Sequence, residues 1–297
     1  MDEKRNKLQT LGKLALLATA LIWGTSFIVL KSTLSDIGPL WTLAIRFTVS
    51  ALLLLAFTGR RIFKVSRRCL KGGVVLGVCL AVAYTLQTYG LVYTTPGKNA
   101  FLTATYCVLT PFLAWLVYKR KPGLSNAIAA FLCISGIGLV SLSEGMTEVN
   151  AGDMLTLACG IFYALQIIVM EQYRDSGDAV AISAVEFSAA AVFFLVSALL
   201  FEKMPSAVPT SAWVSVLYLS VMCTAVCFFL QAWGMQYTSS STAAMLMTLE
   251  SVFGALLSVL FYGEQVTGKL LLGFCLIFIA VLMSELRPFE RRMGERA

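Results

Sequence analysis

The stretch AAMLMTLESVFGALLSVLFYGE, which runs from Ala243 to Glu264, decides the class of the fold. It is apolar almost throughout, and its length is close to the roughly 20 residues that an α-helix needs to cross a lipid bilayer. A single acid, Glu250, lies midway along it. The stretch therefore predicts a membrane-spanning helix that carries a carboxyl group at mid-depth.

Runs of the same kind fill the rest of the chain. Hydrophobic residues make up 58% of the 297 residues and charged residues only 13%, whereas a soluble domain carries about 25% charged residues. The runs are continuously apolar, which favours helices over the alternating strands of a membrane β-barrel. The sequence predicts an all-α membrane protein with ten transmembrane helices, at residues 11–30, 39–58, 70–92, 98–118, 124–142, 152–171, 180–201, 211–235, 240–262 and 268–285.

The positive charges in the joints predict how the chain lies in the membrane. Lys and Arg gather in the N-terminal segment, in the joint at residues 59–71 and after residue 286, all on one predicted side of the bilayer. Cytoplasmic segments carry this excess in membrane proteins. Both the N and C termini are therefore expected to be cytoplasmic, with residues 286–297 as a cytoplasmic tail. The net charge of +7 follows from this topology, and we expect a multi-pass protein of the cell (plasma) membrane that binds no nucleic acid.

The residue types that build metal and catalytic sites are sparse. The chain has no histidine and eight cysteines, nearly all within or beside the apolar runs, and it has no CxxC pair. Metal sites built on histidine are therefore excluded, and no metal and no cofactor are predicted. An enzyme would need clustered acids, histidine, or a nucleophile beside its base. The acids here are scattered, so the protein is not expected to be an enzyme.

The two halves of the chain resemble each other. Residues 87–118 align without gaps with residues 231–262, with identical glutamines, glycines and tyrosines at corresponding positions. Such self-similarity indicates an internal repeat, with five predicted helices in residues 11–142 and five in residues 152–285. Because five is odd, the second unit enters the membrane from the opposite side. Inverted repeats of this kind build many secondary transporters, with the substrate site near the midplane between the halves.

Three motifs give the chain a family resemblance. The segments GLVYTTPGKNAFLTATYCVLTPFLAWLVYKRKP, LESVFGALLSVLFYGEQ and ALIWGTSFIVLKS resemble an EamA-type member of the drug/metabolite transporter superfamily, over residues 11–285. The resemblance implies ten helices around a central cavity. It also implies transport of small metabolites, amino acids, or amphiphilic and cationic compounds, often as efflux driven by an ion gradient. The family has Glu-Pro in the ninth helix, whereas this chain has Ser251 after Glu250, which puts a kink there in doubt.

Glu250 is the first candidate for the site. A charge at mid-bilayer costs at least about 2.5–3.5 kcal/mol, and its own helix holds no Lys, Arg or His. The carboxyl group is expected either to hold a proton or to face a cavity with water or a cation. The alternative is a neutral carboxyl group bonded to a neighbouring backbone or hydroxyl group. The first interpretation predicts a carrier whose partners are a small-molecule substrate, protons and the lipid bilayer.

The other candidates for substrate and ion binding are polar or aromatic residues at mid-helix. Asn99, Thr103 and Tyr106 share one helical face, and Tyr106 corresponds to Glu250 in the repeat. These groups could line the cavity or form ordinary bonds between helices. The remaining candidates are Trp23, Tyr84, Gln87, Tyr163, Gln166 and Gln231. For Trp23, simple packing is an equal alternative.

Two further charges, Arg46 and Glu186, correspond to each other in the repeat. Inversion places them at opposite depths, so no ion pair between them is predicted. Arg46 can extend toward the outer surface or bind an anionic group, and the structural role is favoured. Glu186 is a candidate second acid on the inner pathway.

The leading interpretation is a secondary transporter, and specifically an exporter that exchanges its substrate for protons. The chain has no GxxxxGK[ST] loop, so ATP-driven transport by this chain alone is not expected. A sensor or scaffold that does not transport is the alternative from another class. It would call for a sizeable soluble domain or a long loop, and the apolar runs leave little room for either.

Overall fold

The computed structural model describes residues 2–119, 121–141, 150–173, 179–238, 240–286 and 288. Within these ranges the chain forms no strand, and it has ten helical spans that are long and apolar enough to cross a membrane. The predicted ten-helix, all-α fold is thereby confirmed. The spans are Lys7–Thr33, Pro39–Ile62, Arg67–Tyr93, Pro96–Tyr118, Leu124–Ser141, Ala151–Tyr173, Val180–Phe201, Thr210–Tyr237, Met245–Tyr262 and Gly268–Leu286. The predicted tail lies outside the described residues, apart from residues 286 and 288.

Seven spans are each built on one uninterrupted α-helix, and three are divided. The uninterrupted helices are α1 (Asp2–Thr33), α2 (Pro39–Thr58), α3 (Arg67–Tyr93), α6 (Leu124–Ser141), α7 (Ala151–Tyr173), α8 (Ala179–Phe201) and α13 (Gly268–Leu286). A short 3₁₀ helix, η1 (Gly59–Lys64), extends α2. The divided spans are α4 (Pro96–Ala104) with α5 (Tyr106–Tyr118), α9 (Thr210–Ser220) with the π-helical η2 (Val221–Val226) and α10 (Cys227–Tyr237), and α11 (Ser240–Met247) with α12 (Leu249–Leu257) and the π-helical η3 (Ser258–Tyr262).

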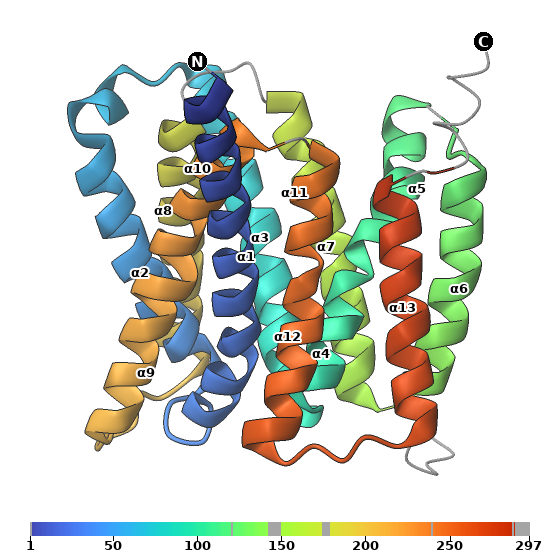
Figure 1. The fold of residues 1–297 in the computed structure, drawn as a ribbon. Helices are drawn as coiled ribbons and strands as arrows, with labels where there is room; N and C mark the ends of the chain where they lie inside the picture. Colours follow the sequence, from blue (N-terminus) through green and yellow to red (C-terminus); the bar gives the residue numbers. More distant parts are fainter. Residues whose placement is uncertain are drawn as a thin grey trace.

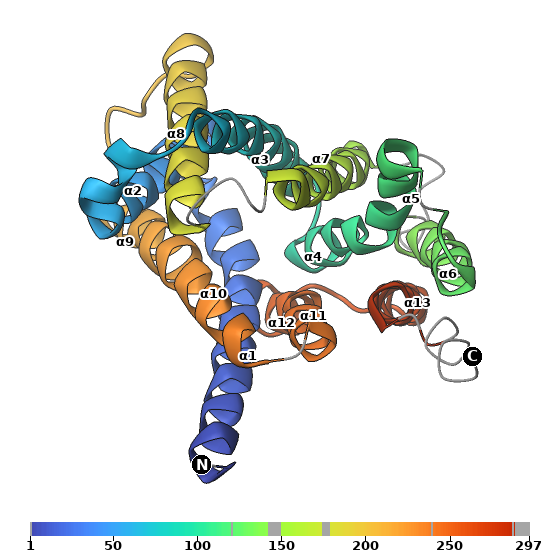
Figure 2. The same cartoon turned by 90° about the horizontal axis from the view of Figure 1, so that it is seen from above.

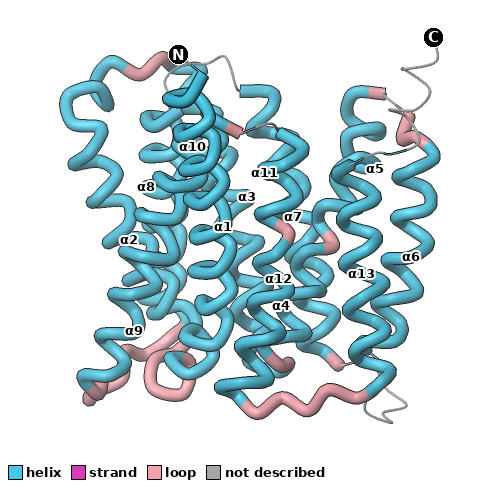
Figure 3. The backbone as a smooth tube through the Cα atoms, viewed as in Figure 1, coloured by secondary structure: helices cyan, strands magenta, loops and turns pink. Residues whose placement is uncertain are grey.

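The helices run side by side in a bundle with loops at its two ends (Figures 1 and 3). Helix α1 begins and α13 ends at the same end of the bundle, which we call the N-terminal end; α7 begins at the opposite end, which we call the far end (Figure 1). Seen along the bundle, α2, α8 and α9 lie at one side and α5, α6 and α13 at the other (Figure 2). The principal helix pairs are α3 with α7, α2 with α8, and α6 with α13, so each joins an early part of the chain to a late one.

The outer surface of the bundle is strongly apolar. Large side chains such as Phe57, Phe131, Phe201 and Phe261 are exposed. Soluble monomers rarely expose contiguous apolar surface of this kind, whereas lipid chains accept it. The surface therefore suits a bilayer, and the polar groups that the sequence places at mid-helix must be accommodated inside the bundle.

The helix pair α3 and α7 is brought together by two glycines. A Cβ atom on Gly152 would lie 2.7 Å from the carbonyl oxygen of Gly90 and 2.8 Å from the backbone nitrogen of Thr94. Neither backbone atom can rotate away as a side chain would. Small residues allow such close helix approach, and this contact fixes the depth at which α3 and α7 present their polar residues to the interior.

Two of the divided spans are interrupted at places that differ by only one residue in the alignment of the two halves. Thr105 separates α4 from α5, with a ψ angle of −17°. Thr248 separates α11 from α12, with a ψ angle of −18°. The second interruption is present although Ser251 stands where the family has proline. The hydroxyl group of Thr248 donates to the carbonyl oxygen of Met245 at 2.8 Å, and that of Ser251 donates to the carbonyl oxygen of Thr248 at 2.9 Å. Side chains that bond the backbone in this way bend helices.

The first interrupted span also contains Pro111, which has no N–H for the carbonyl oxygen four residues earlier, at Cys107. The hydroxyl group of Ser284, from α13, donates to that carbonyl oxygen at 2.9 Å. The backbone group that proline leaves free is therefore satisfied by a neighbouring helix, as buried polar groups in a membrane require.

Candidate functional site

Glu250 lies in the first turn of α12, just beyond the interruption at Thr248, and is half-buried. The charges of Arg46 and Glu250 act on each other, and Glu250 also acts electrostatically on the hydroxyl groups of three tyrosines. These are Tyr84 of α3, Tyr106 of α5 and Tyr163 of α7. The groups that this charge acts on come from four other helices, so Glu250 lies within electrostatic reach of the interior of the bundle.

The three tyrosines form an aromatic cluster around Tyr163. The ring centre of Tyr163 lies 5.7 Å from that of Tyr84, nearly edge to face at 77°, and 6.0 Å from that of Tyr106. All three are half-buried; Tyr84 and Tyr163 lie within α3 and α7, and Tyr106 begins α5 at the middle of its span. Tyrosine rings can hold a cation over their faces, and a nearby carboxylate adds to that attraction.

A hydrogen-bond chain fixes the hydroxyl group of Tyr163. This group donates to the side-chain oxygen of Gln87 at 2.9 Å, and the side-chain nitrogen of Gln87 donates to the hydroxyl oxygen of Thr103 at 3.0 Å. The side chain of Asn99 donates to the backbone oxygen of Gln87 and, at 2.8 Å, to the hydroxyl oxygen of Thr156. Asn99 and Thr103 are buried. Their hydrogen bonds join α4 to α3 and α7, as expected for ordinary bonds between helices, which was the alternative to lining a cavity. Through Gln87 they also hold the hydroxyl group of Tyr163 in place.

Trp23 of α1 lies beside the divided span α9–η2–α10. Its indole nitrogen donates to the carbonyl oxygen of Cys223 at 2.7 Å, and its ring centre lies 5.7 Å from that of Phe228. Cys223 belongs to the π-helical η2. Single π turns are frequent at functional sites because they disturb the regular backbone bonding. Trp23 is half-buried and packs against this turn.

Gln166 and Gln231 are not joined to the tyrosine cluster by the hydrogen bonds of the described residues, although Gln166 follows Tyr163 by one turn of α7. The side-chain nitrogen of Gln166 donates to a carboxyl oxygen of Glu186 at 2.5 Å. Glu186 is 1% exposed, and its other carboxyl oxygen lacks a hydrogen-bond partner. Gln231 is half-buried, and no hydrogen bond within the described ranges links it to the cluster. The hydrogen bonds and ring contacts of the described residues therefore link most of the predicted site residues, but they do not link these two glutamines to the cluster.

Arg46 belongs to the centre of the bundle. It is only 2% exposed, its Nε donates to the hydroxyl oxygen of Thr224 at 3.0 Å, and its guanidinium carbon lies 5.0 Å from the ring centre of Tyr84. The side chain therefore does not extend to the outer surface, which was one of the two possibilities that the sequence left open, and its contacts with Thr224 and Tyr84 join α2 to η2 and α3. The repeat pointed to Glu186 as its counterpart. The sequence feature that could have indicated a buried position for Arg46 is a charged residue within an otherwise apolar run.

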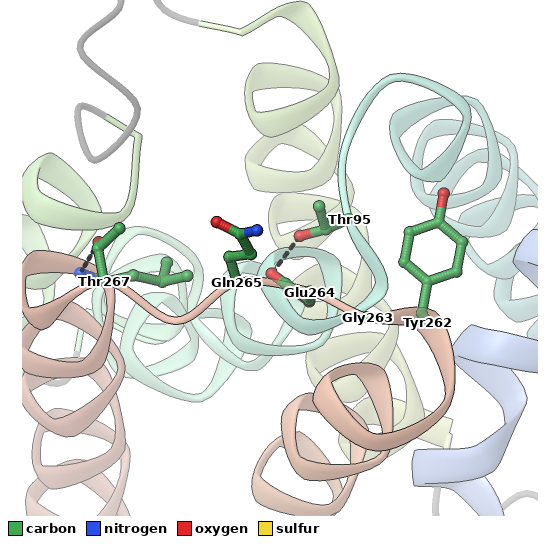
Figure 4. A pocket seen from close by; sticks show the side chains of 7 residues that line it. Thr95, Tyr262, Gly263, Glu264, Gln265 and Thr267 are labelled. Carbon is green, nitrogen blue, oxygen red and sulfur yellow. Dashed lines mark hydrogen bonds between the residues drawn. The ribbon is translucent and has the colours of Figure 1, made fainter.

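A second carboxylate missed by sequence reasoning lies at the far end, away from Glu250. Glu264 accepts hydrogen bonds from the hydroxyl group of Thr95, from the backbone nitrogen of Gly97 at 3.0 Å and from the hydroxyl group of Ser258 at 2.5 Å. It lines a shallow pocket of about 400 Å³ (Figure 4). A carboxylate at a helix N-terminus is stabilised by the free N–H groups there. Glu264 therefore ties the start of α4 to the end of α12.

Comparisons with known proteins agree with this architecture. The model of the EamA-like transporter family matches residues 10–142 and again residues 150–286. An uncharacterized transporter of Archaeoglobus fulgidus is 33% identical over 92% of this chain and 85% of its own. The uncharacterized transporter YoaV of Bacillus subtilis is 24% identical over 94% of this chain and 98% of its own. A solved crystal structure with 17% identity superposes with a TM-score of 0.68 over 95% of this chain and 98% of that chain, which supports the fold alone.

The ten apolar spans and the transporter relatives confirm the predicted multi-pass protein of the cell membrane. The double match of the family model and the relative with 33% identity confirm the resemblance seen in the sequence motifs. The chain belongs to the EamA-like transporter family.

Proposed function

We propose that the protein is a secondary active transporter that exports small metabolites, amino acids, or amphiphilic and cationic compounds in exchange for protons. The observation that carries this proposal is the position of Glu250, an acid inside the bundle that acts on three tyrosines from three other helices. Acids at this depth are rare and usually mark ion or substrate pathways.

Residues 11–142 and 152–285 are proposed to form two inverted five-helix repeats, with both chain ends in the cytoplasm. The double match of the family model supports two units. The start of α7 at the far end, opposite the start of α1, supports their opposite orientation (Figure 1). Under the positive-inside rule, the N-terminal end of the bundle is the cytoplasmic one.

Exchange follows from competition at one carboxyl group. Glu250 holds either a proton or the cationic group of a substrate, and the faces of Tyr84, Tyr106 and Tyr163 bind that cationic group alongside it. Substrate binding from the cytoplasm then displaces the proton. Protonation from the other side displaces the substrate, so that an inward proton gradient drives export.

Alternating access requires the halves to move around this site. The interruptions at Thr105 and Thr248 allow each divided span to bend at mid-depth. In this structure α4 packs against α12, whereas α5 packs against α6, α7 and α13. The parts of the two spans nearer the far end are thus in contact, and we propose that this contact opens when the site faces the outside. Discontinuous helices flank the binding site in many carriers with inverted repeats.

A flux screen in proteoliposomes tests the proposal. Purified protein is reconstituted, a pH gradient is imposed, and uptake of a panel of metabolites, amino acids and organic cations is measured for the wild type and for Glu250→Gln. We expect gradient-driven flux in the wild type and its loss in the variant. Equal gradient-driven flux in a correctly folded variant would reject Glu250 as the coupling group.

A further inference from the structure

Arg46 is a buried charge about a third of the way along a membrane-spanning helix. Its side chain is 2% exposed in α2. A charge at this depth costs several kcal/mol unless an opposite charge or suitable hydrogen bonds compensate it. The groups that compensate the charge of Arg46 therefore indicate what kind of molecule the site can bind.

The contacts of Arg46 use only part of its guanidinium group. Nε donates to the hydroxyl oxygen of Thr224 at 3.0 Å, and the group lies 5.0 Å from the ring centre of Tyr84 and 5.9 Å from that of Phe47. In the described part of the chain, neither terminal nitrogen has a hydrogen-bond partner, and no carboxylate oxygen lies within 4.0 Å of the guanidinium nitrogens. Neither nitrogen belongs to the fully enclosed polar atoms that lack a partner, so both retain accessible surface.

These contacts hold the guanidinium group in a defined direction. Thr224 anchors one edge, and it lies in the π-helical η2, whose irregular turn places this hydroxyl group opposite α2. Tyr84 supports the group through its ring. The terminal nitrogens remain as a planar fork, and such a fork matches a carboxylate through two parallel hydrogen bonds.

We propose that Arg46 is an anion subsite of the transport site, and that the transported molecule carries a carboxylate that binds there. This inference rests on the proposed function, because it places the subsite within the same central cluster. Arg46 acts electrostatically on Tyr84, Tyr163 and Glu250. A substrate with a carboxylate at Arg46 can therefore place a cationic group among the tyrosines.

The subsite narrows the substrate class. Glu250 and the substrate carboxylate have Arg46 as a common positive neighbour. A purely cationic substrate would add a positive charge beside Arg46 and Glu250 and leave the two terminal nitrogens of Arg46 without a partner. A zwitterion places its carboxylate at Arg46 and its cationic group near Glu250. The site thus favours small zwitterions over organic cations of the same size.

Matched acids and amides test the subsite. The purified full-length protein is titrated with the proteinogenic α-amino acids and short monocarboxylic acids, each beside its own primary amide, and apparent affinities are taken from the shift in melting temperature. In the wild type we expect at least one acid to bind about tenfold more tightly than its amide, a difference of about 1.4 kcal/mol. Arg46→Gln is expected to abolish that preference. Arg46→Lys keeps the charge without the fork and should reduce it.

Two further variants keep the test decisive. Thr224→Val removes the anchor of Nε and is expected to weaken the acid severalfold with little effect on the amide, which tests the subsite even if Arg46→Gln does not fold. Arg68→Gln is the matched control: Arg68 is another arginine of the bundle, whose side chain donates to the backbone oxygen of Gln172, and the preference should persist. Amides that bind as well as acids, a wild type that binds no acid of the panel, or a folded Arg46→Gln that keeps the preference would each overturn the proposal.

The same preparation separates this inference from the proposed function. If Glu250→Gln loses gradient-driven flux while amides bind as well as acids, the anion subsite fails and the transporter mechanism stands. If Arg46 variants lose the preference while Glu250→Gln keeps gradient-driven flux, the subsite stands and the coupling role of Glu250 fails.

Discussion

Glu264 and Gly97 meet at the far end of the bundle, where a carboxylate oxygen of Glu264 accepts the backbone N–H of Gly97 at 3.0 Å. Gly97 lies in the first turn of α4, and Glu264 follows η3. The residue before it, Gly263, ends that span in the left-handed region, with φ of 73°, where glycine is unstrained. The contact joins the two interrupted spans at their far ends.

Replacing Glu264 by glutamine should destabilise the protein. The amide keeps the shape but removes the charge from bonds to Thr95, Gly97 and Ser258, and hydrogen bonds to charged groups contribute about 1.5–3 kcal/mol. We expect Glu264→Gln to lose about 1–3 kcal/mol of stability and to melt at a lower temperature in detergent. The neighbouring Gln265 is exposed, so Gln265→Ala serves as the control. Identical melting of both variants and the wild type would refute the role given to Glu264.

Alanine at Gly152 should be far more harmful than alanine at Gly138. The new methyl group at residue 152 would press on the backbone of α3 at 2.7–2.8 Å, whereas a Cβ atom at Gly138 meets no atom within 4 Å. Overpacking costs about 1–3 kcal/mol, and replacing an unconstrained helical glycine by alanine gains about 0.5–1 kcal/mol. Thermal unfolding of the two variants should therefore shift in opposite directions. A shift of the same sign and size would mean that α3 and α7 are not in contact at this point.

The pair Pro111 and Ser284 should behave as a coupled unit. Ser284→Ala leaves the carbonyl oxygen of Cys107 without its donor, at a cost of about 1–3 kcal/mol for a buried polar group. Pro111→Ala restores a backbone N–H to α5, so the double variant should lose less stability than Ser284→Ala alone. A double-mutant cycle on melting data measures this coupling. Strictly additive losses would show that the hydroxyl group does not compensate for the proline.

The hydroxyl group of Tyr163 should matter for substrate affinity. Tyr163→Phe keeps the ring but removes the donor to Gln87, so that both the glutamine and the ring lose their fixed position. We expect KM for transport to rise severalfold. Tyr118→Phe is the matched control, because the hydroxyl group of Tyr118 donates to the backbone oxygen of Ile168 at 3.0 Å, outside the tyrosine cluster. An equal KM for the wild type and Tyr163→Phe would remove the hydrogen-bond chain from the account.

The sequence predicted the spans well because hydropathy is a local property. An apolar run of about 20 residues, such as the one around Glu250, is long enough to cross a bilayer whatever helices lie beside it, so its length and composition alone indicate a membrane span. The candidates Tyr84, Tyr106 and Tyr163 came from helical spacing and repeat correspondence, and the structure places their rings beside one another; their role in binding stays a prediction.

The position of Arg46 could not be predicted in this way. Its contact with Thr224 depends on how α2 packs against η2. Nothing in the sequence around either residue indicates that the two are neighbours in space. The repeat pairs equivalent positions, which is different from pairing neighbours in space, and so it pointed to Glu186. The interruption at Thr248 was equally hidden, because Ser251, whose hydroxyl group donates to the carbonyl oxygen of Thr248, stands in place of the proline that usually signals a kink.

The central claim is that a proton and the substrate compete for Glu250, and proton release on binding tests it most directly. Purified protein in weakly buffered detergent solution is mixed with a substrate found in the flux screen, and the pH is followed with an indicator dye. We predict that the wild type releases protons when substrate binds and that Glu250→Gln binds substrate without releasing them. Equal proton release from the wild type and a folded Glu250→Gln variant would contradict the account.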